Sequence, residues 1–536
     1  MQFDPHDHPH PSRRVAIYAR RGMVATSQPL AAQAGLDMLR RGGNAVDAAI
    51  ATAIALTVVE PTSNGIGGDA FSLVWSGGRL HGLNASGPAP RRLTIAELES
   101  RGIRDKMPEV GFAPVTVPGA PAAWAELSKR FGRLSFAALF EPAIELAQAG
   151  YPVSPVTGRA WEAAYRRYER ELTGPEFSAW FSTFAPEGRA PRVGEIWRSP
   201  DHAETLRKIA ESGAEAFYRG ELAERIDRFS REYGGFIRLE DLAAFRPEWV
   251  DPIHVDYRGY DVWEIPPNGH GLVALMALNL LKCFDLSGRS PADRYHIEIE
   301  AIKLAFADGR HYIADPRFMS ARVEDLLSEG YAEERRRLIG ESAALPNPGR
   351  PQAGGTVYLC AADGEGNMVS YIQSNYQGFG SGLVVPGTGI ALHNRGANFS
   401  LDSAHVNALA PGKRPYHTII PGFLTKAGQA VGPFGVMGAF MQPQGHVQVL
   451  VNMIDLRLNP QAALDAPRWQ WLEGRKVAAE YGIPPHVLES LSRRGHEMAW
   501  SADTGSFGRG QIIWRLDNGV LVGGTEPRAD GQVAAW

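Results

Sequence analysis

The stretch PGRPQAGGTVYLCAADGEGNMVSYIQS, residues 348–374, changes character at a single residue. Up to Gly355 it is rich in proline, glycine and polar residues, which is typical of an exposed connector. From Thr356 it alternates like a buried β-strand, turns at DGEGN and continues as a second strand. The sequence therefore predicts a β-hairpin that begins abruptly at a threonine, directly after two glycines.

An N-terminal threonine would give this position a chemical meaning. A threonine hydroxyl is a poor nucleophile unless a base lies beside it, and the α-amine of a chain that begins with threonine supplies that base. An unperturbed α-amine has a pKa of roughly 7.7–8.0, so part of it is unprotonated near neutral pH. Cutting the Gly355–Thr356 bond would expose this amine, and a Gly354-Gly355 pair leaves the scissile carbonyl open to attack. The local pattern alone also fits an ordinary strand after a glycine turn.

Composition limits the classes of protein. The chain has 536 residues, of which 44% are hydrophobic and 21% charged, with a formal net charge of −4. No block of lysine and arginine stands out, so we expect no nucleic-acid partner. The longest apolar stretch, residues 48–59, is too short to span a bilayer, and the N-terminus lacks the apolar core of a secretion signal. Because only Cys283 and Cys360 occur, no disulfide framework is expected, and we predict a cytoplasmic protein without a membrane partner.

The order of the predicted elements indicates one folding unit. Helical spacing predicts helices over residues 29–43 and 44–59, the second capped by Asn44. Residues 62–85 follow as a glycine loop that leads into two strands, and the middle of the chain is mostly amphipathic helix with a strand pair at 251–269. After Thr356 strands dominate, and helices return at 445–458 and 484–495. Strands and helices from both ends predict one α+β unit built from a discontinuous chain.

Other candidates for chemistry have simpler structural interpretations. GIGGDAF, residues 65–71, is followed by a strand rather than a helix, which favours a tight turn near a pocket over a phosphate loop. Cys360 lies inside a predicted strand and is expected to be a core residue. No G-x-S-x-G elbow supports a serine triad. HDHPH, at His6–His10, is interrupted by proline and predicts a solvated tail. We expect neither a metal nor a cofactor.

Seven segments, in order, resemble the γ-glutamyltransferase family. They are RRGGNAVDAAIATAIALTVVEPTSNGIGGDAF, VTVPGAPAAW, GGFIRLEDLAAFRPEWVDPI, AFADGRHYIADPR, GNMVSYIQSNYQGFGSGLVVPGTGIAL, QVLVNMIDLRLNPQAALDAPRW and GGTEPRADGQVAAW. The resemblance runs from about Gly22 to the C-terminus. It implies a four-layer αββα sandwich of the N-terminal-nucleophile hydrolase class. It also implies a precursor that cuts itself at Gly355–Thr356 into a large chain, residues 1–355, and a small chain, residues 356–536, which stay associated; a further dimer is left open.

The same resemblance implies roles for the catalytic residues. Thr356 falls at the position of the nucleophile, whose own α-amine acts as the base. Ser374 falls at the position of the hydroxyl residue that contacts it. The backbone N–H groups of the oxyanion hole, which come from a Gly-Gly pair in the family, fall on Gly438 and Ala439. An alanine keeps this role only if it can adopt the required backbone conformation.

The substrate-binding positions depart from the family pattern. Members that bind γ-glutamyl groups hold the α-carboxylate with an arginine and a Ser-Ser pair, and the α-amine with an acid. At the positions of the arginine and the acid, this sequence has Asn84 and Asn398. The remaining pocket positions carry Tyr376, Arg395, His417 and Thr418. Losing both ionic contacts disfavours a zwitterionic glutamyl group, at roughly 1.5–3 kcal/mol per charged hydrogen bond.

We therefore expect a self-processing amide hydrolase that acts on a small dicarboxylic monoamide, such as a glutaryl or oxalyl amide. Arg395 and His417 would then meet the substrate carboxylate, with no ammonium required. Two alternatives remain open. One is a true glutathione hydrolase or γ-glutamyl transferase that recognises glutamate through other contacts. The other is a non-catalytic binding protein on the same fold, which an uncut chain would favour.

Overall fold

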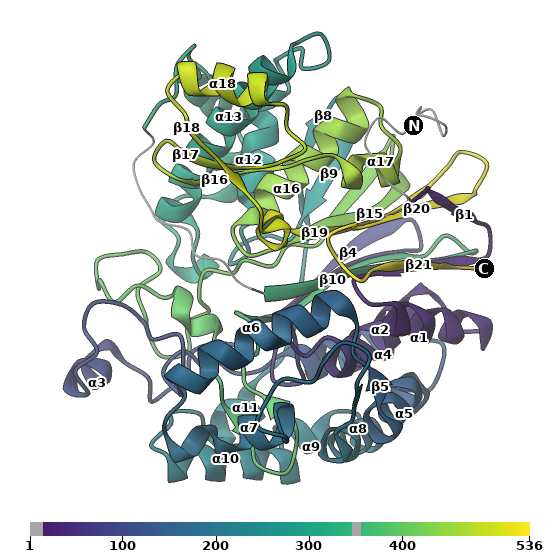
Figure 1. Cartoon of the computed structure of the whole chain (residues 1–536), viewed down its shortest axis with the longest axis vertical. Coiled ribbons are helices and arrows are strands. Elements are labelled where there is room, and N and C mark those ends of the chain that lie inside the picture. The colour runs from purple at the N-terminus through teal and green to yellow at the C-terminus, as the bar shows by residue number, and fades with distance from the viewer. Residues whose placement is uncertain (1–13, 346–354) are drawn as a thin grey trace.

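Two seven-stranded antiparallel sheets lie face to face, and helices cover the outer face of each sheet (Figure 1). The computed structural model describes residues 14–345 and 355–536. The order of the first sheet is β1 (Ile17–Ala19), β20 (Leu521–Thr525), β19 (Arg509–Arg515), β15 (Gln429–Met437), β14 (Gly422–Lys426), β9 (Tyr260–Glu264) and β8 (Ile253–Tyr257). The order of the second is β21 (Gln532–Ala535), β2 (Gly22–Thr26), β10 (Gly355–Asp363), β11 (Met368–Tyr376), β3 (Asp69–Ser76), β4 (Arg79–Ala85) and β7 (Glu248–Val250).

The two helical layers lie at opposite ends of the view in Figure 1. The helices beside the second sheet include α1 (Pro29–Arg40), α2 (Ala45–Val59), α4 (Ala120–Phe131), α5 (Glu141–Ala149), α6 (Pro155–Glu171), α7 (Ser178–Phe184), α8 (Pro200–Ser212), α10 (Glu221–Glu232) and α11 (Leu239–Ala244). The helices beside the first sheet include α12 (Gly271–Leu281), α13 (Pro291–Tyr312), α15 (Glu329–Arg336), α16 (Met441–Leu450), α17 (Pro460–Asp465) and α18 (Pro485–Arg493).

Separate hydrophobic clusters fill the spaces between the layers. Met23, Phe71, Tyr358, Phe423 and Ile513 are buried between the two sheets. A second cluster joins α1, α2 and their neighbours to the second sheet, and a third joins α12, α13 and α16 to the first sheet. This arrangement is the expected αββα sandwich, in which each sheet is covered on both faces.

Local sequence explains the elements that lead to the site. Asn44 caps α2 and forms a reciprocal capping box with Asp47, and every residue of α2 is buried, as its continuous apolar sequence indicates. The predicted hairpin is β10 and β11, and strands from both sides of Thr356 lie in each sheet. Cys360 is a core residue, as expected.

Some elements differ from the sequence expectations. The helix expected at 445–458 begins at Met441 as α16 and continues through a π-helical turn at Val451–Asp455. A further small sheet of β16 (Trp469–Glu473), β17 (Lys476–Glu480) and β18 (Glu497–Ser501) was not expected from the pattern. His6–His10 and Gly354 lie outside the described residues.

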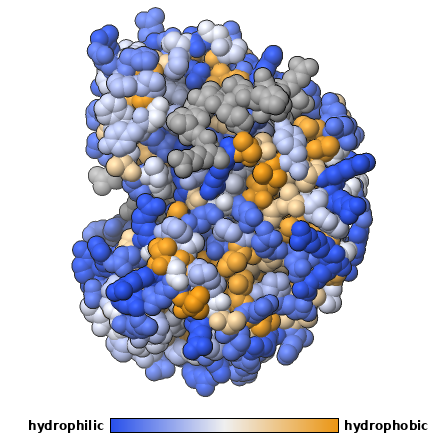
Figure 2. All heavy atoms as spheres, turned by 45° about the vertical axis from the view of Figure 1, so that its right-hand side comes forward, coloured by the Kyte–Doolittle hydropathy of each residue, from blue (hydrophilic) through white to orange (hydrophobic). Residues whose placement is uncertain are grey.

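Figure 2 shows a mainly hydrophilic face on which hydrophobic residues form small separate groups. Among residues 14–345 and 355–536, no helix combines the length and the apolar character needed to cross a membrane.

Candidate active site

Thr356 occupies an irregular position in the middle of the second sheet. It is the second residue of β10, which pairs with β2 on one side and β11 on the other. The register shifts between Gly355 and Val357, so Thr356 lies at a bulge, and bulges commonly re-aim a side chain beside an active site. The buried Oγ1 of Thr356 lies 2.9 Å from Oγ of Ser374 in β11. That serine Oγ also accepts a hydrogen bond of 2.7 Å from the backbone N–H of Tyr376.

A sharp turn follows β15 at the predicted oxyanion residues. Gly438 and Ala439 have φ values of 139° and 49°, and α16 begins two residues later. Within the described part of the chain, neither N–H donates to another backbone carbonyl. The φ of Ala439 shows that this alanine does adopt the left-handed conformation. That conformation costs an alanine roughly 1–2 kcal/mol relative to glycine. Oxyanion stabilisation requires backbone N–H donors that are not already engaged by other carbonyls.

The close packing of β15 on β10 brings this turn toward the start of β10. A Cβ atom added at Gly435 of β15 would lie 2.5 Å from the ring of Tyr358, two residues after Thr356. The absence of a side chain at Gly435 therefore lets the tyrosine ring pack directly against the β15 backbone. The Tyr358 hydroxyl is fixed at its other end, 2.7 Å from Oγ of Ser370.

A buried charged cluster lies beside Ser374. Asp69, the first residue of β3, pairs in register with Ser374 of β11. Its carboxylate accepts hydrogen bonds from Nε (3.1 Å) and Nη2 (3.3 Å) of Arg395, and from Nε2 of His417 (2.6 Å). All three side chains are fully buried. Burial alone would raise the pKa of Asp69, but Arg395 and His417 hold it well below its usual range.

The other contacts of Arg395 gather more of the predicted pocket. Its Nη1 donates to Oγ1 of Thr418 at 2.7 Å, and its guanidinium carbon lies 4.6 Å from the centroid of the Tyr376 ring. The Tyr376 hydroxyl donates to Oδ1 of Asn398 at 2.8 Å. Tyr376 has a φ of 73°, an uncommon conformation for a large residue that is found at functional sites. The structure thus brings Tyr376, Arg395, Asn398, His417 and Thr418 together.

His417 is a neutral hydrogen-bond donor in this cluster. Burial and the nearby Arg395 charge lower its pKa to about 4. Its Nδ1 accepts a hydrogen bond from the backbone N–H of Ile419, so the proton lies on Nε2, which faces Asp69. The charge of the cluster therefore comes from one carboxylate and one guanidinium.

Asn84 does not contact the cluster through its side-chain hydrogen bonds but is linked to it through Asn268. Its side-chain amide donates to Oδ1 of Asn268 at 3.0 Å, and the backbone carbonyl of Asn268 accepts the N–H of His417 at 2.9 Å. The structure thus places Asn84 behind His417, in a second row of polar contacts.

Sequence reasoning missed Asp69. It was seen only as part of the glycine turn at residues 65–71, which the structure does contain as a tight Gly65–Gly68 turn. The available signal was an acidic residue at the start of a strand whose first six residues are buried. Such a residue needs a buried partner, but the partners Arg395 and His417 are more than 300 residues away in the sequence.

One group of side chains has the composition of a metal site. His296, Glu300 and His496 place three candidate ligand atoms within 4.8 Å of one another. However, Nζ of Lys303 already lies 2.6 Å from Oε1 of Glu300, and Nδ1 of His296 lies 2.8 Å from Nε2 of His496. The Lys303 ammonium opposes a second cation there. Glu300 and Lys303 also bind the backbone of Ala344, so the group is explained as a structural clasp.

The chain matches known proteins over nearly its whole length. The family model described as gamma-glutamyltranspeptidase matches residues 31–536. The chain belongs to the gamma-glutamyltranspeptidase family. Within this family it is 36% identical to a glutathione hydrolase-like proenzyme of Bacillus subtilis, over 96% of this chain and 98% of the relative. It is 35% identical to an oxamate amidohydrolase proenzyme of Klebsiella pneumoniae, again over 96% of this chain and 98% of the relative.

A solved family member has nearly the same fold. The crystal structure of a cephalosporin acylase from Bacillus halodurans matches with a TM-score of 0.96 and 63% identity, covering 100% of this chain and 99% of the other. These matches confirm the predictions of the family, of the sandwich fold and of an enzyme of the amide-hydrolysing type.

Proposed function

We propose that this family member is a self-processing amide hydrolase whose nucleophile is Thr356. The observation that carries the proposal is the buried contact of 2.9 Å between Thr356 and Ser374, at a bulge in the central strand. In the precursor, Oγ1 of Thr356 would attack the Gly355 carbonyl and form an ester, which water then hydrolyses. This step would leave residues 1–355 and 356–536 as two chains and free the α-amine of Thr356.

In the mature enzyme the same oxygen would attack the substrate amide. The α-amine takes the hydroxyl proton and passes it to the leaving amine. The negative charge that develops on the carbonyl oxygen is stabilised by the N–H groups of Gly438 and Ala439. The acyl group is then held as an ester on Thr356 until water, activated by the same α-amine, releases the acid.

The acyl group that fits the cluster is a small dicarboxylic acid. Because Arg395 pairs with Asp69, that carboxylate gives no uncompensated negative charge for a substrate ammonium. Asn398, at the position where the family has an acid, is neutral. An arginine carries five N–H donors, and the contacts to Asp69 and Thr418 use three of those of Arg395. The remaining two can receive a substrate carboxylate as a fork. The acylase and amidohydrolase names of the relatives support this class.

The two chains should remain associated after cleavage, because each sheet contains strands from both. Separating them would expose the apolar surface between and outside the sheets. We also keep the cytoplasm as the proposed compartment, on the sequence argument alone.

A pair of chromogenic substrates tests the acyl specificity. Glutaryl-p-nitroanilide and γ-glutamyl-p-nitroanilide carry the same carboxylate and differ only at the α-carbon, where the second has an ammonium in place of a hydrogen. We expect a kcat/KM about tenfold to a hundredfold higher for the glutaryl compound, since the γ-glutamyl ammonium finds no acidic partner in the pocket and must be desolvated without a charged contact. Faster hydrolysis of the γ-glutamyl compound would instead support the glutathione hydrolase alternative. An uncut chain that hydrolyses neither compound would support the non-catalytic alternative.

A further inference from the structure

An open cavity adjoins the oxyanion turn on one side. Its volume is about 390 Å³, and its walls include Thr62, Tyr168, Gln377, Gly438 and Arg509. None of the five clustered pocket residues around Asp69 lines it. The carbonyl of a bound amide would lie at Gly438, with its acyl half toward that cluster. The amine half must point away from the acyl half, and this cavity, which Gly438 lines, offers space for it.

Arg509 enters this cavity from the strand next to the turn. It lies in β19, opposite Met437, the residue before Gly438. Its side chain is 14% exposed, and its Nη1 lies 3.5 Å from Oε1 of Glu60. The buried Nε has no hydrogen-bond partner among the described residues. A Cβ added at Gly505, which also borders the cavity, would lie 3.9 Å from Nη2, so this nitrogen faces the cavity loop.

The positive charge of Arg509 is only partly neutralised by its acidic neighbour Glu60. Burial raises the pKa of Glu60 despite the nearby guanidinium, and Ser27 also donates to that carboxyl. Arg167, which also lines the cavity, is already paired with Glu109 at 2.9 Å and with Glu171 at 2.8 Å.

Asp503 is the acidic residue among those that line the cavity. Its Oδ1 accepts the backbone N–H of Gly505 at 3.0 Å. Of the two arginines that line the cavity, Arg509 is the one whose ion pair is long, at 3.5 Å from Glu60.

We infer that Arg509 binds a carboxylate on the amine half of the amide substrate and thereby selects amides of amino carboxylic acids. This inference rests on the proposed function and adds the specificity of its second half. Arg509 lines the cavity with Nη2 toward the cavity loop, so a carboxylate bound there can accept charge-assisted hydrogen bonds from the guanidinium. Because the cavity adjoins the carbonyl site, a short spacer between the amide nitrogen and the carboxylate suffices.

The test uses amides that share one acyl group and differ only in the amine half. Glutaryl amides of glycine, β-alanine and 4-aminobutyrate carry a carboxylate, and the glutaryl amides of ethylamine, propylamine and butylamine are their neutral counterparts. We expect Arg509→Gln to lower kcat/KM for the best anionic amide by about tenfold to a hundredfold, chiefly through KM. The neutral amides should change by less than about threefold. Arg509→Lys should recover part of the loss.

Controls separate this inference from the proposed function. Arg515→Gln removes an exposed charge from the same strand, and we expect it to leave the anionic-to-neutral ratio unchanged. Self-cleavage of each variant reports that it has folded. Equal losses for anionic and neutral amides in cleaved Arg509→Gln would overturn the inference and leave the proposed function standing. No hydrolysis of any glutaryl amide by the cleaved wild-type enzyme would contradict both.

Discussion

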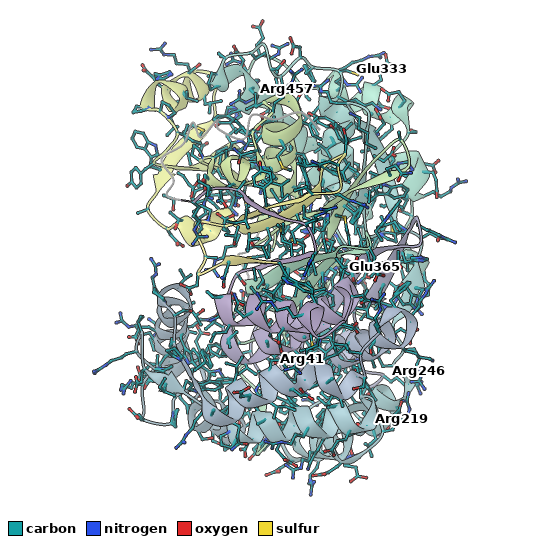
Figure 3. The ribbon with its side chains drawn as sticks, turned by 90° about the vertical axis from the view of Figure 1, so that its right-hand side faces the viewer. Arg41, Arg219, Arg246, Glu333, Glu365 and Arg457 are labelled. Carbon is teal, nitrogen blue, oxygen red and sulfur yellow. The ribbon has the colours of Figure 1, made fainter. Side chains whose placement is uncertain are left out.

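Asp69 and Arg395 form a buried ion pair between two residues 326 positions apart, one on each side of Thr356. The carboxylate also receives His417, and the guanidinium also holds Thr418 and covers Tyr376. The pair therefore organises the predicted acyl pocket through contacts that are sheltered from water. Exposed charges differ in this respect: Arg219 and Glu333, at opposite ends of the molecule in Figure 3, are both in contact with solvent, which screens them.

Breaking this ion pair should destabilise the protein strongly. Asp69→Asn leaves the Arg395 charge buried without its partner, and we expect the free energy of unfolding to fall by about 3–5 kcal/mol. Adding Arg395→Gln should recover part of that loss, because the unpaired charge is then removed. The measurement is urea unfolding in a Thr356→Ala background, in which each variant stays one chain.

The matched control is the ion pair of Glu365 with Arg133, whose side chains are 61% and 48% exposed. Glu365, labelled in Figure 3, lies in the turn between β10 and β11. Glu365→Gln should cost less than about 1 kcal/mol. A loss for Asp69→Asn no larger than for Glu365→Gln would show that the buried pair does not hold the pocket together.

Maturation should depend on the Thr356 hydroxyl. Purified wild-type protein is expected to contain two fragments, the smaller of which begins at Thr356. Thr356→Ala should remain one chain, because the group that attacks the Gly355 carbonyl is gone, whereas Thr356→Ser keeps a hydroxyl and should still be cut. Intact-mass analysis distinguishes these species. Wild-type protein that stays uncut and yet hydrolyses amides would disprove the assignment of the nucleophile.

The parts of this structure that could be predicted from sequence are those set by nearby residues. The apolar run and the Asn44 cap specify α2. The alternation of apolar and polar residues on both sides of the turn at residues 363–367 specifies the β10–β11 hairpin. The family pattern indicated the five clustered pocket positions. It did not indicate their mutual contacts, because Asp69 replaces no expected ligand and its partners are distant in sequence. The left-handed Ala439 likewise follows from the surrounding packing and not from a local preference.

The conformation of Ala439 should matter for catalysis more than for folding. Ala439→Val places a β-branched residue at a φ of 49°, which such residues avoid, so the turn should shift and misplace its N–H donors. We expect kcat to fall about a hundredfold or more, as when one oxyanion donor is lost. Ala439→Gly should keep kcat. Steady-state kinetics with the glutaryl anilide reports both effects.

Ala427 provides the control for this substitution. It has a φ of 50° and lies in the exposed turn between β14 and β15, at the opposite end of β15 from Gly438 and Ala439. Ala427→Val should bring a similar backbone strain but leave kcat unchanged. A similar loss of kcat in both valine variants would assign the effect to general instability and not to the oxyanion turn.

Acid should destabilise the fold through histidines that are buried in the neutral form. Burial lowers the pKa of His202 in α8 to about 4, and its Nε2 lies 3.2 Å from Oγ1 of Thr57 in α2. In the unfolded chain a histidine has a pKa of about 6.5. Between these two values the unfolded state binds more protons than the folded state, so the free energy of unfolding falls as the pH is lowered. The contribution of one such histidine is about 1.4 kcal/mol per pH unit, and it levels off below the folded-state pKa.

In the Thr356→Ala background, His202→Gln should therefore reduce the slope of the unfolding free energy against pH, between pH 6.5 and pH 4, by the equivalent of about one proton. His486 is exposed, and His486→Gln serves as the control that should leave this slope as it is in the parent. Equal slopes for the parent and His202→Gln would show that His202 is not held neutral by its burial.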